Sequence, residues 1–103
     1  MKFARLAFAA ALTLAALMTA ANAQQTHVIM ATATPGGGFP LSGDNAAAVI
    51  NETDASLKVE TRNTKGSAEN IGLLEAGTMD IGLVAGEPAY DAFAGIGRAP
   101  VNL

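Results

Sequence analysis

Three short runs typical of β-strands recur along this chain, each followed by a loop containing glycine or proline and then by a run with helical periodicity. The runs cover residues 28–31, 57–61 and 81–84. The first and third are continuously apolar, as in strands covered on both faces. The second alternates apolar and polar side chains, which is typical of a half-exposed strand at a sheet edge. We therefore expect an α/β fold of βαβ units, with a parallel sheet, right-handed crossovers and strand order 2-1-3.

The helix expected after the first strand begins at Pro40, because proline suits the first turn of a helix. Ala46, Val49 and Ile50 then fall at i, i+3 and i+4, which is the spacing of one apolar helix face. Asn51 is a plausible end for this helix.

The second expected helix begins at Ser67, whose hydroxyl has the chemistry of an N-cap, and Glu69 suits the positive end of the helix dipole. Gly77 closes this helix. The third helix carries an apolar face that includes Tyr90 and Phe93, expected to lie mostly in the core, with a Tyr90 hydroxyl that faces a cleft as the alternative. This helix stops at Gly95 and Gly97.

The first 23 residues have the pattern of a cleaved secretory signal peptide: Lys2 and Arg5, an apolar stretch over 6–21, and the small-residue ending Ala21-Asn22-Ala23. The apolar stretch is shorter than the ~20 residues needed to span a bilayer. We expect an exported protein, periplasmic in a bacterium, whose mature part is residues 24–103. At that length a self-sufficient core is marginal.

Charge and cysteine content exclude several classes of function. Residues 24–103 contain nine acidic and four basic side chains, and because nucleic acids are negatively charged, a nucleic-acid partner is not expected. The chain has no cysteine, which removes disulfides, thiolate metal sites and a cysteine nucleophile. No cofactor and no metal site is expected.

Ligands of open parallel sheets bind outside the carboxyl ends of the strands. Three loops lie there in the expected fold, at 34–40, 62–70 and 85–90. In the first, glycines allow backbone N–H groups to approach an anion just before a helix start. In the second, hydroxyl and amide side chains precede another helix start and suit a carboxylate. A tight turn without a ligand is the alternative for the first loop, and simple helix capping for the second.

No catalytic arrangement is present in the sequence. The glycine loop fails the dinucleotide fingerprint, because counting from Gly36 places Leu41 where the third glycine belongs. It also lacks the lysine of a phosphate-binding Walker loop. His27, the only histidine, has no partner for catalysis in the sequence pattern, and Ser42 lacks a nucleophile elbow. We expect that the protein is not an enzyme.

Three motifs together resemble the N-terminal part of TAXI-type solute-binding proteins of TRAP transporters. They are Thr-Pro-Gly-Gly-Gly-Phe-Pro-Leu at 34–41, Asn-Thr-Lys-Gly-Ser-Ala-Glu-Asn-Ile at 63–71, and Asp-Ile-Gly-Leu-Val at 80–84 with Ala-Tyr-Asp-Ala at 89–92. Their order and spacing are those of the family, and the likeness covers essentially all of residues 24–103.

The resemblance implies a two-lobed periplasmic binding protein of the type II architecture. Such a receptor closes on a small organic acid, such as glutamate or 2-oxoglutarate, and delivers it to a TRAP-type membrane permease. Family members are about three times longer, so residues 24–103 are expected to be a truncated N-terminal part of the first lobe. Together with the loop chemistry, the resemblance predicts these ligand-binding residues: Thr34, Gly36, Gly37, Gly38, Phe39, Thr64, Gly66, Ser67, Asn70, Glu87 and Tyr90.

The chain departs from the family at two of its loops. Phe39 stands where many members have tyrosine, and Ala85 and Gly86 replace a common glutamine and serine. Glu87 would oppose a dianionic ligand unless a cation or proton offsets its charge. Two alternatives remain open: a fragment of a nucleotide-binding α/β enzyme, and an exported module without a small ligand.

Overall fold

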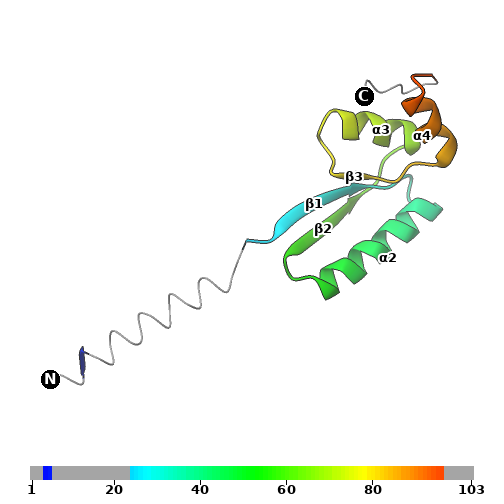
Figure 1. The fold of residues 1–103 in the computed structure, drawn as a ribbon. Helices are drawn as coiled ribbons and strands as arrows, with labels where there is room; N and C mark the ends of the chain where they lie inside the picture. Colours follow the sequence, from blue (N-terminus) through cyan, green and yellow to red (C-terminus); the bar gives the residue numbers. More distant parts are fainter. Residues whose placement is uncertain (1–3, 6–23, 97–103) are drawn as a thin grey trace.

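The computed structural model describes residues 4–5 and 24–96. The signal peptide predicted over 1–23 therefore lies largely outside the described residues. Strands and helices alternate along the chain (Figure 1). In order they are β1 (Thr26–Ala31), α2 (Gly38–Thr53), β2 (Leu57–Arg62), α3 (Ser67–Glu75), β3 (Ile81–Gly82) and α4 (Gly86–Phe93).

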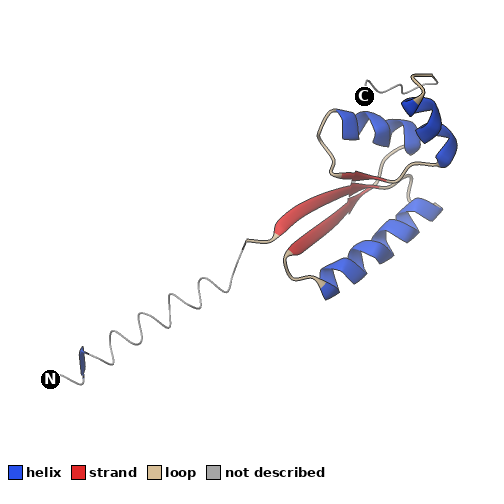
Figure 2. Ribbon diagram, viewed as in Figure 1, coloured by secondary structure: helices blue, strands red, loops and turns tan. Residues whose placement is uncertain are grey.

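The three strands form one parallel sheet in the order β2-β1-β3, which confirms the predicted fold class and the predicted strand order. β1 pairs with β2 from Thr26↔Leu57 to Ala31↔Arg62, and with β3 at Met30↔Ile81 and Ala31↔Gly82. Helix α2 lies on one face of the sheet, whereas α3 and α4 lie on the other (Figure 2). The central strand is thus covered from both sides where it meets the two others.

The core between α2 and the sheet is small and is built from Met30, Ala47 and Val59. Val28, Ile50 and Leu83 pack around it, half-buried. Gly43 lets α2 approach the sheet closely, because a Cβ there would lie 2.6 Å from the Thr32 Cγ2.

Gly82 has the same effect on the other face, where a Cβ would lie 2.8 Å from the Leu74 Cδ1 of α3. On each face of the sheet, therefore, one glycine allows a helix and the sheet to pack closely.

Glycines end two of the helices, as predicted. Gly77 has φ 72° and donates to the Leu74 carbonyl, while the Thr78 N–H reaches back to the Leu73 carbonyl. Gly95, with φ 71°, closes α4 in the same way. Both pairs of bonds form the Schellman motif, which satisfies carbonyls at a helix end. Gly97 lies outside the described residues.

Several predicted boundaries are wrong. α2 begins at Gly38, so Pro40 is its third residue rather than its first, and it continues past Asn51 to Thr53. β3 is only two residues long instead of four, although the Leu83 N–H still donates to the Ala31 carbonyl at 3.0 Å. Residues 83–85 then connect β3 to the first residue of α4.

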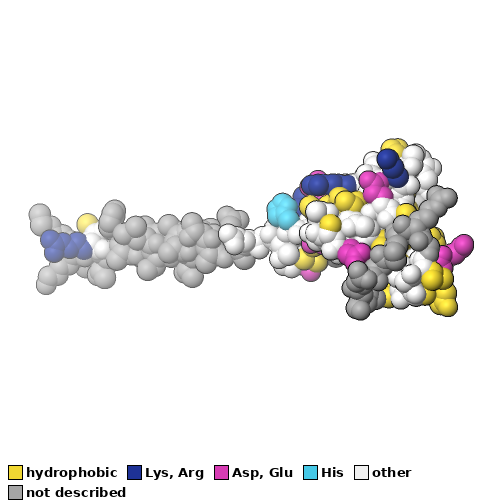
Figure 3. Space-filling view, turned by 90° about the horizontal axis from the view of Figure 1, so that it is seen from above, with side chains coloured by type: hydrophobic (Ala, Val, Ile, Leu, Met, Phe, Trp, Pro, Cys, Tyr) yellow, Lys and Arg dark blue, Asp and Glu magenta, His cyan; other side chains and the backbone are white. Residues whose placement is uncertain are grey.

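The expectation that Tyr90 and Phe93 lie in the core is also wrong. Their side chains are 70% and 71% exposed. Ala92 is the buried residue of α4. Figure 3 shows apolar and charged side chains interspersed over the visible part of the described surface. No helix among residues 4–5 and 24–96 is long and apolar enough to cross a membrane.

Candidate functional site

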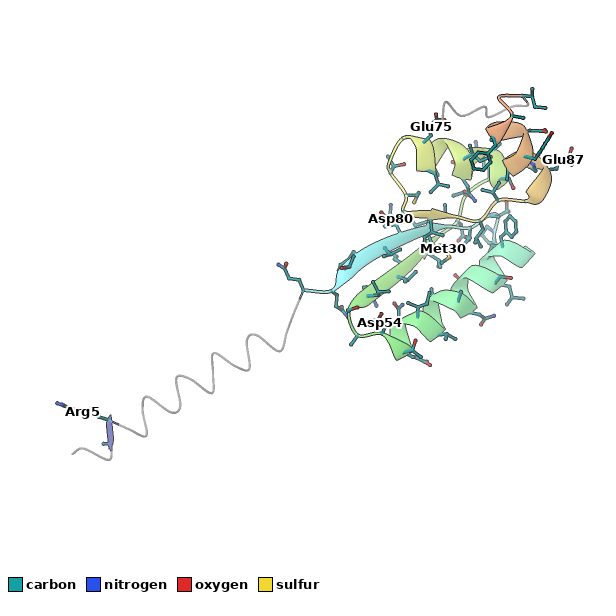
Figure 4. The ribbon with its side chains drawn as sticks, viewed as in Figure 1. Arg5, Met30, Asp54, Glu75, Asp80 and Glu87 are labelled. Atoms are coloured by element: carbon teal, nitrogen blue, oxygen red, sulfur yellow. The ribbon has the colours of Figure 1, made fainter. Side chains whose placement is uncertain are left out.

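Three helices begin at the edge of the sheet where the parallel strands end. α2 follows β1, α3 follows β2 and α4 follows β3. The N-cap residues of the three helices, Gly37, Gly66 and Ala85, make no side-chain hydrogen bond to the first turn that follows. An uncapped start presents unpaired N–H groups and the positive end of the helix dipole. Figure 4 shows Glu87 at this end of the molecule, whereas Asp54 lies at the far end of α2.

The loop before α2 is an open glycine turn. The Gly37 N–H donates to the Thr34 carbonyl at 3.2 Å, and Gly36 adopts φ 88°, a conformation that favours glycine. The loop borders a shallow hollow of about 360 Å³. The residues that line this hollow are Gly36, Gly37, Gly38, Pro40, Leu41 and Asp44. Phe39 is half-buried beside it. The structure therefore exposes the backbone of all three predicted glycines.

The loop before α3 is held by the side chain of Thr64. Its hydroxyl donates to the Asn70 Oδ1 at 2.6 Å and also lies 3.3 Å from the Thr32 carbonyl. The same hydroxyl accepts from the Gly66 N–H at 3.2 Å. Gly66 has φ 119°, which explains why glycine stands at this position. Thr64 thus fixes the turn that leads into α3.

Asn70 lies beneath the loops and has no exposed surface. Its Nδ2 donates to the Thr32 carbonyl at 2.7 Å and to the Leu83 carbonyl at 2.8 Å. One side chain therefore joins the ends of β1 and β3 to the loop after β2. Among the described residues, no buried side-chain polar atom lacks a partner. Asn70, predicted to bind ligand, is placed where it supports the loops from behind rather than on their open side.

Ser67 is not the N-cap of α3, which corrects the prediction. Gly66 occupies the cap position, and Ser67 is the first helical residue. The Ser67 Oγ instead accepts a hydrogen bond of 3.0 Å from the Ala85 N–H, at the start of α4. Ser67 is therefore a link between the second and third loops.

The third loop presents an acidic group and an aromatic group. Glu87 is exposed in the first turn of α4, and Tyr90 lies one turn further along the helix. Glu69 takes the corresponding place in α3, and its carboxylate accepts from the Lys65 N–H. Among the predicted site residues, the three glycines of the first loop, Glu87 and Tyr90 are exposed, whereas Thr64, Ser67 and Asn70 form the hydrogen bonds that connect the loops.

Two features of this edge were missed in the sequence. Thr32 is fully buried and donates through its hydroxyl to the Arg62 carbonyl at 3.0 Å, and the Asn63 Nδ2 donates to the Ala33 carbonyl at 3.0 Å. Both tie the first loop to the second. The missed signal is the run of polar residues that directly follows two strands.

A second pattern in the sequence was also overlooked. α2 and α4 both begin with a glycine at their first residue and a proline at their third, in Gly38-Phe39-Pro40 and Gly86-Glu87-Pro88.

Within residues 4–5 and 24–96, no three His, Asp or Glu side chains are grouped to hold a metal.

A model of the NMT1-like family matches residues 30–101, which includes all three loops. The chain belongs to the NMT1-like family. Members of this family are domains that resemble solute-binding proteins, and they are generally non-enzymatic. The parallel sheet and its βαβ units agree with part of a periplasmic-binding-protein lobe. No curated protein matches the chain.

Proposed function

We propose that this NMT1-like domain is the solute-binding part of an exported receptor, and that it takes up a small organic anion at the carboxyl edge of its sheet. The observation that carries the proposal is the convergence of three uncapped helix starts at that edge. Unpaired N–H groups at a helix start and the positive end of the helix dipole both favour a carboxylate. Hydrogen bonds of Thr64, Ser67 and Asn70 connect the three loops to one another.

Glu87 narrows the class of ligand. Its carboxylate is exposed in the first turn of α4, beside one of the three helix starts. A dianionic oxo acid would be repelled by this carboxylate, whereas an amino acid offers an ammonium group to it. We therefore favour a glutamate-like ligand over a 2-oxoglutarate-like one.

The role in transport rests on the sequence. The motifs resemble those of TAXI-type receptors, and residues 1–23 have the pattern of a signal peptide. The proposed receptor is periplasmic and delivers its ligand to a TRAP-type permease. No described feature favours a nucleotide-binding enzyme over this function.

Calorimetric titration and thermal shift with glutamate, 2-oxoglutarate, succinate and ATP test the proposal. We expect saturable binding of glutamate, with a melting temperature that rises with ligand concentration. Saturable binding of ATP alone would support the nucleotide-binding alternative. A flat response to every compound would remove the basis for an anion receptor.

A pair of variants tests the part played by Glu87. Glu87→Gln should strengthen 2-oxoglutarate binding relative to glutamate, because it removes the negative charge beside the site. Glu52→Gln is the matched control, since Glu52 is exposed in the last turn of α2, at the opposite end of that helix. An equal effect of both substitutions would contradict the assignment of Glu87 to the site.

A further inference from the structure

Among residues 24–96, β2 lies at the edge of the sheet and pairs only with β1 (Figure 1). The Thr26 N–H donates to the Ser56 carbonyl at 2.8 Å, and the Thr32 N–H donates to the Arg62 carbonyl at 2.9 Å. Because peptide groups alternate in direction along a strand, the even-numbered residues of β2 bond to β1. The outward-facing backbone groups of β2 are therefore those of Leu57, Val59 and Thr61, of which the Leu57 N–H already donates to the Asp54 carbonyl at 3.2 Å.

The side chain of Asn51, in α2, occupies the middle of this outer edge. Its Nδ2 donates to the Val59 carbonyl at 2.9 Å, and its Oδ1 accepts from the Val59 N–H at 2.7 Å. One carboxamide thus satisfies both backbone groups of a single edge residue. Two residues of adjoining antiparallel strands exchange the same pair of bonds when they form a hydrogen-bonded pair. Asn51 therefore stands where a residue of another strand would lie.

The sequence of β2 is complementary to itself about Val59. In an antiparallel pair of two β2 strands centred on Val59, Lys58 of one copy lies opposite Glu60 of the other, and the reverse. Both side chains are exposed, and Glu60 also forms an exposed ion pair of 3.5 Å through its Oε1 with Arg62 of the same strand. Opposite charges directly across two strands stabilise the pairing, and the twofold arrangement makes each contact twice.

We propose that the outer edge of β2 is a latent pairing edge for a second copy of this chain, blocked in the unmodified molecule by the Asn51 carboxamide. An uncovered strand edge is a template for pairing with another chain. Asn51 supplies the missing partner from within the same molecule. Its removal frees the two groups of Val59 that the second copy needs, and the charges of Lys58 and Glu60 set the register.

Hydrogen exchange on the unmodified chain gives the first test. The Val59 N–H should exchange at least tenfold more slowly than the Thr61 N–H, although both face the same edge. Equal exchange at the two positions would overturn the proposal, because Asn51 would then not close the edge. This measurement needs no variant and so does not depend on whether a substituted chain folds.

Sedimentation equilibrium of the full chain gives the second test. Asn51→Ala should form a dimer whose fraction rises with concentration, and Val59 should lose its protection at low concentration and regain it as the dimer forms. Asn45→Ala is the control, since Asn45 is an exposed residue of the same type in the same helix. It should behave as the unmodified chain does. A folded Asn51→Ala chain that stays monomeric at every concentration would overturn the proposal.

Charge variants test the register. Adding Lys58→Glu to Asn51→Ala places two glutamates opposite one another and should abolish the dimer. Adding Glu60→Lys as well restores opposite charges and should restore it. A dimer that survives Lys58→Glu would refute this pairing. If Asn51→Ala does not fold, Asn51→Leu serves in its place, because its side chain fills a similar volume but has neither a donor nor an acceptor for the Val59 backbone groups.

Discussion

The hydroxyl of Thr64 lies 2.6 Å from the Oδ1 of Asn70 and donates a hydrogen bond to it. That bond leaves the Nδ2 of Asn70 facing the two strand ends, where it donates to the Thr32 and Leu83 carbonyls. The carboxamide orientation is therefore determined by Thr64, and three segments of the chain meet at one buried amide. A polar group without exposed surface stabilises a fold only when its partners are all present.

Asn70→Ala should lower the free energy of unfolding by about 2–4 kcal/mol, because the Thr64 hydroxyl and the Thr32 and Leu83 carbonyls lose their hydrogen-bond partner. Urea denaturation measures this loss. Asn45→Ala replaces the same residue type at an exposed helix position and should change stability by less than about 0.5 kcal/mol. Similar losses in the two variants would mean that the hydrogen bonds of Asn70 contribute nothing to the free energy of unfolding.

Ser67→Ala removes the acceptor for the Ala85 N–H and should cost about 1 kcal/mol. The diagnostic change is faster hydrogen exchange at Ala85, with little change along α3, because Ser67 is not the cap of that helix. If the proposed function holds, glutamate binding should fall by more than the stability does. Ser42→Ala, at an exposed position of α2, should leave Ala85 unaffected.

Two glycine substitutions should have opposite signs. Gly43→Ala places a Cβ 2.6 Å from the Thr32 Cγ2 and should destabilise the fold by about 1–3 kcal/mol. Gly72→Ala, inside α3, meets nothing within 4 Å and should stabilise by about 0.5–1 kcal/mol through helix propensity. Thermal denaturation compares the two. Stabilisation by Gly43→Ala would show that α2 packs less closely on the sheet than described.

The carboxylate of Asp54 should make the free energy of unfolding depend on pH in the acidic range. The Ser56 hydroxyl, and then the Ser56 N–H, donate to its carboxylate and hold the pKa of Asp54 below its ordinary value of 3.8. A group with a depressed folded pKa stabilises the fold above its ordinary value, and the contribution is lost as the pH falls through the folded pKa. Ser56→Ala should move the pKa of Asp54 upward in a carboxyl NMR titration. An unchanged value would rule out the hydroxyl as its main cause.

The order of elements could be predicted because it depends on local patterns. The alternation over 57–61 identified an edge strand, and that observation alone placed β1 at the centre. The Schellman motifs at Gly77 and Gly95 were predictable because glycine is the usual residue where a helix ends in the left-handed conformation, and each glycine directly follows an apolar helix face.

The contacts between elements were not predictable in this way. Ser67 has the residue type of a cap, yet the positive φ of Gly66 makes Gly66 the cap, and the Ser67 hydroxyl turns to α4 instead. The periodicity of Tyr90 and Phe93 marks an apolar face but does not say what covers it. Asn51 was predicted as a helix end and Asn70 as a ligand-binding residue, and their roles as hydrogen-bonding links become visible only when their partners in other elements are placed.

The central position of the first strand has a consequence for the order in which the molecule can assemble. The Thr32 hydroxyl bonds to a residue 30 positions later, and the Ile29 N–H bonds to the Asp80 carboxylate 51 positions later. β1 therefore has no permanent neighbour while the ribosome is still adding those segments. Pairings this distant in sequence form slowly, because the intervening chain must first be gathered in. A newly made chain thus cannot complete its sheet until the segment around Asp80 has been synthesised, and one edge of β1 stays unpaired until then.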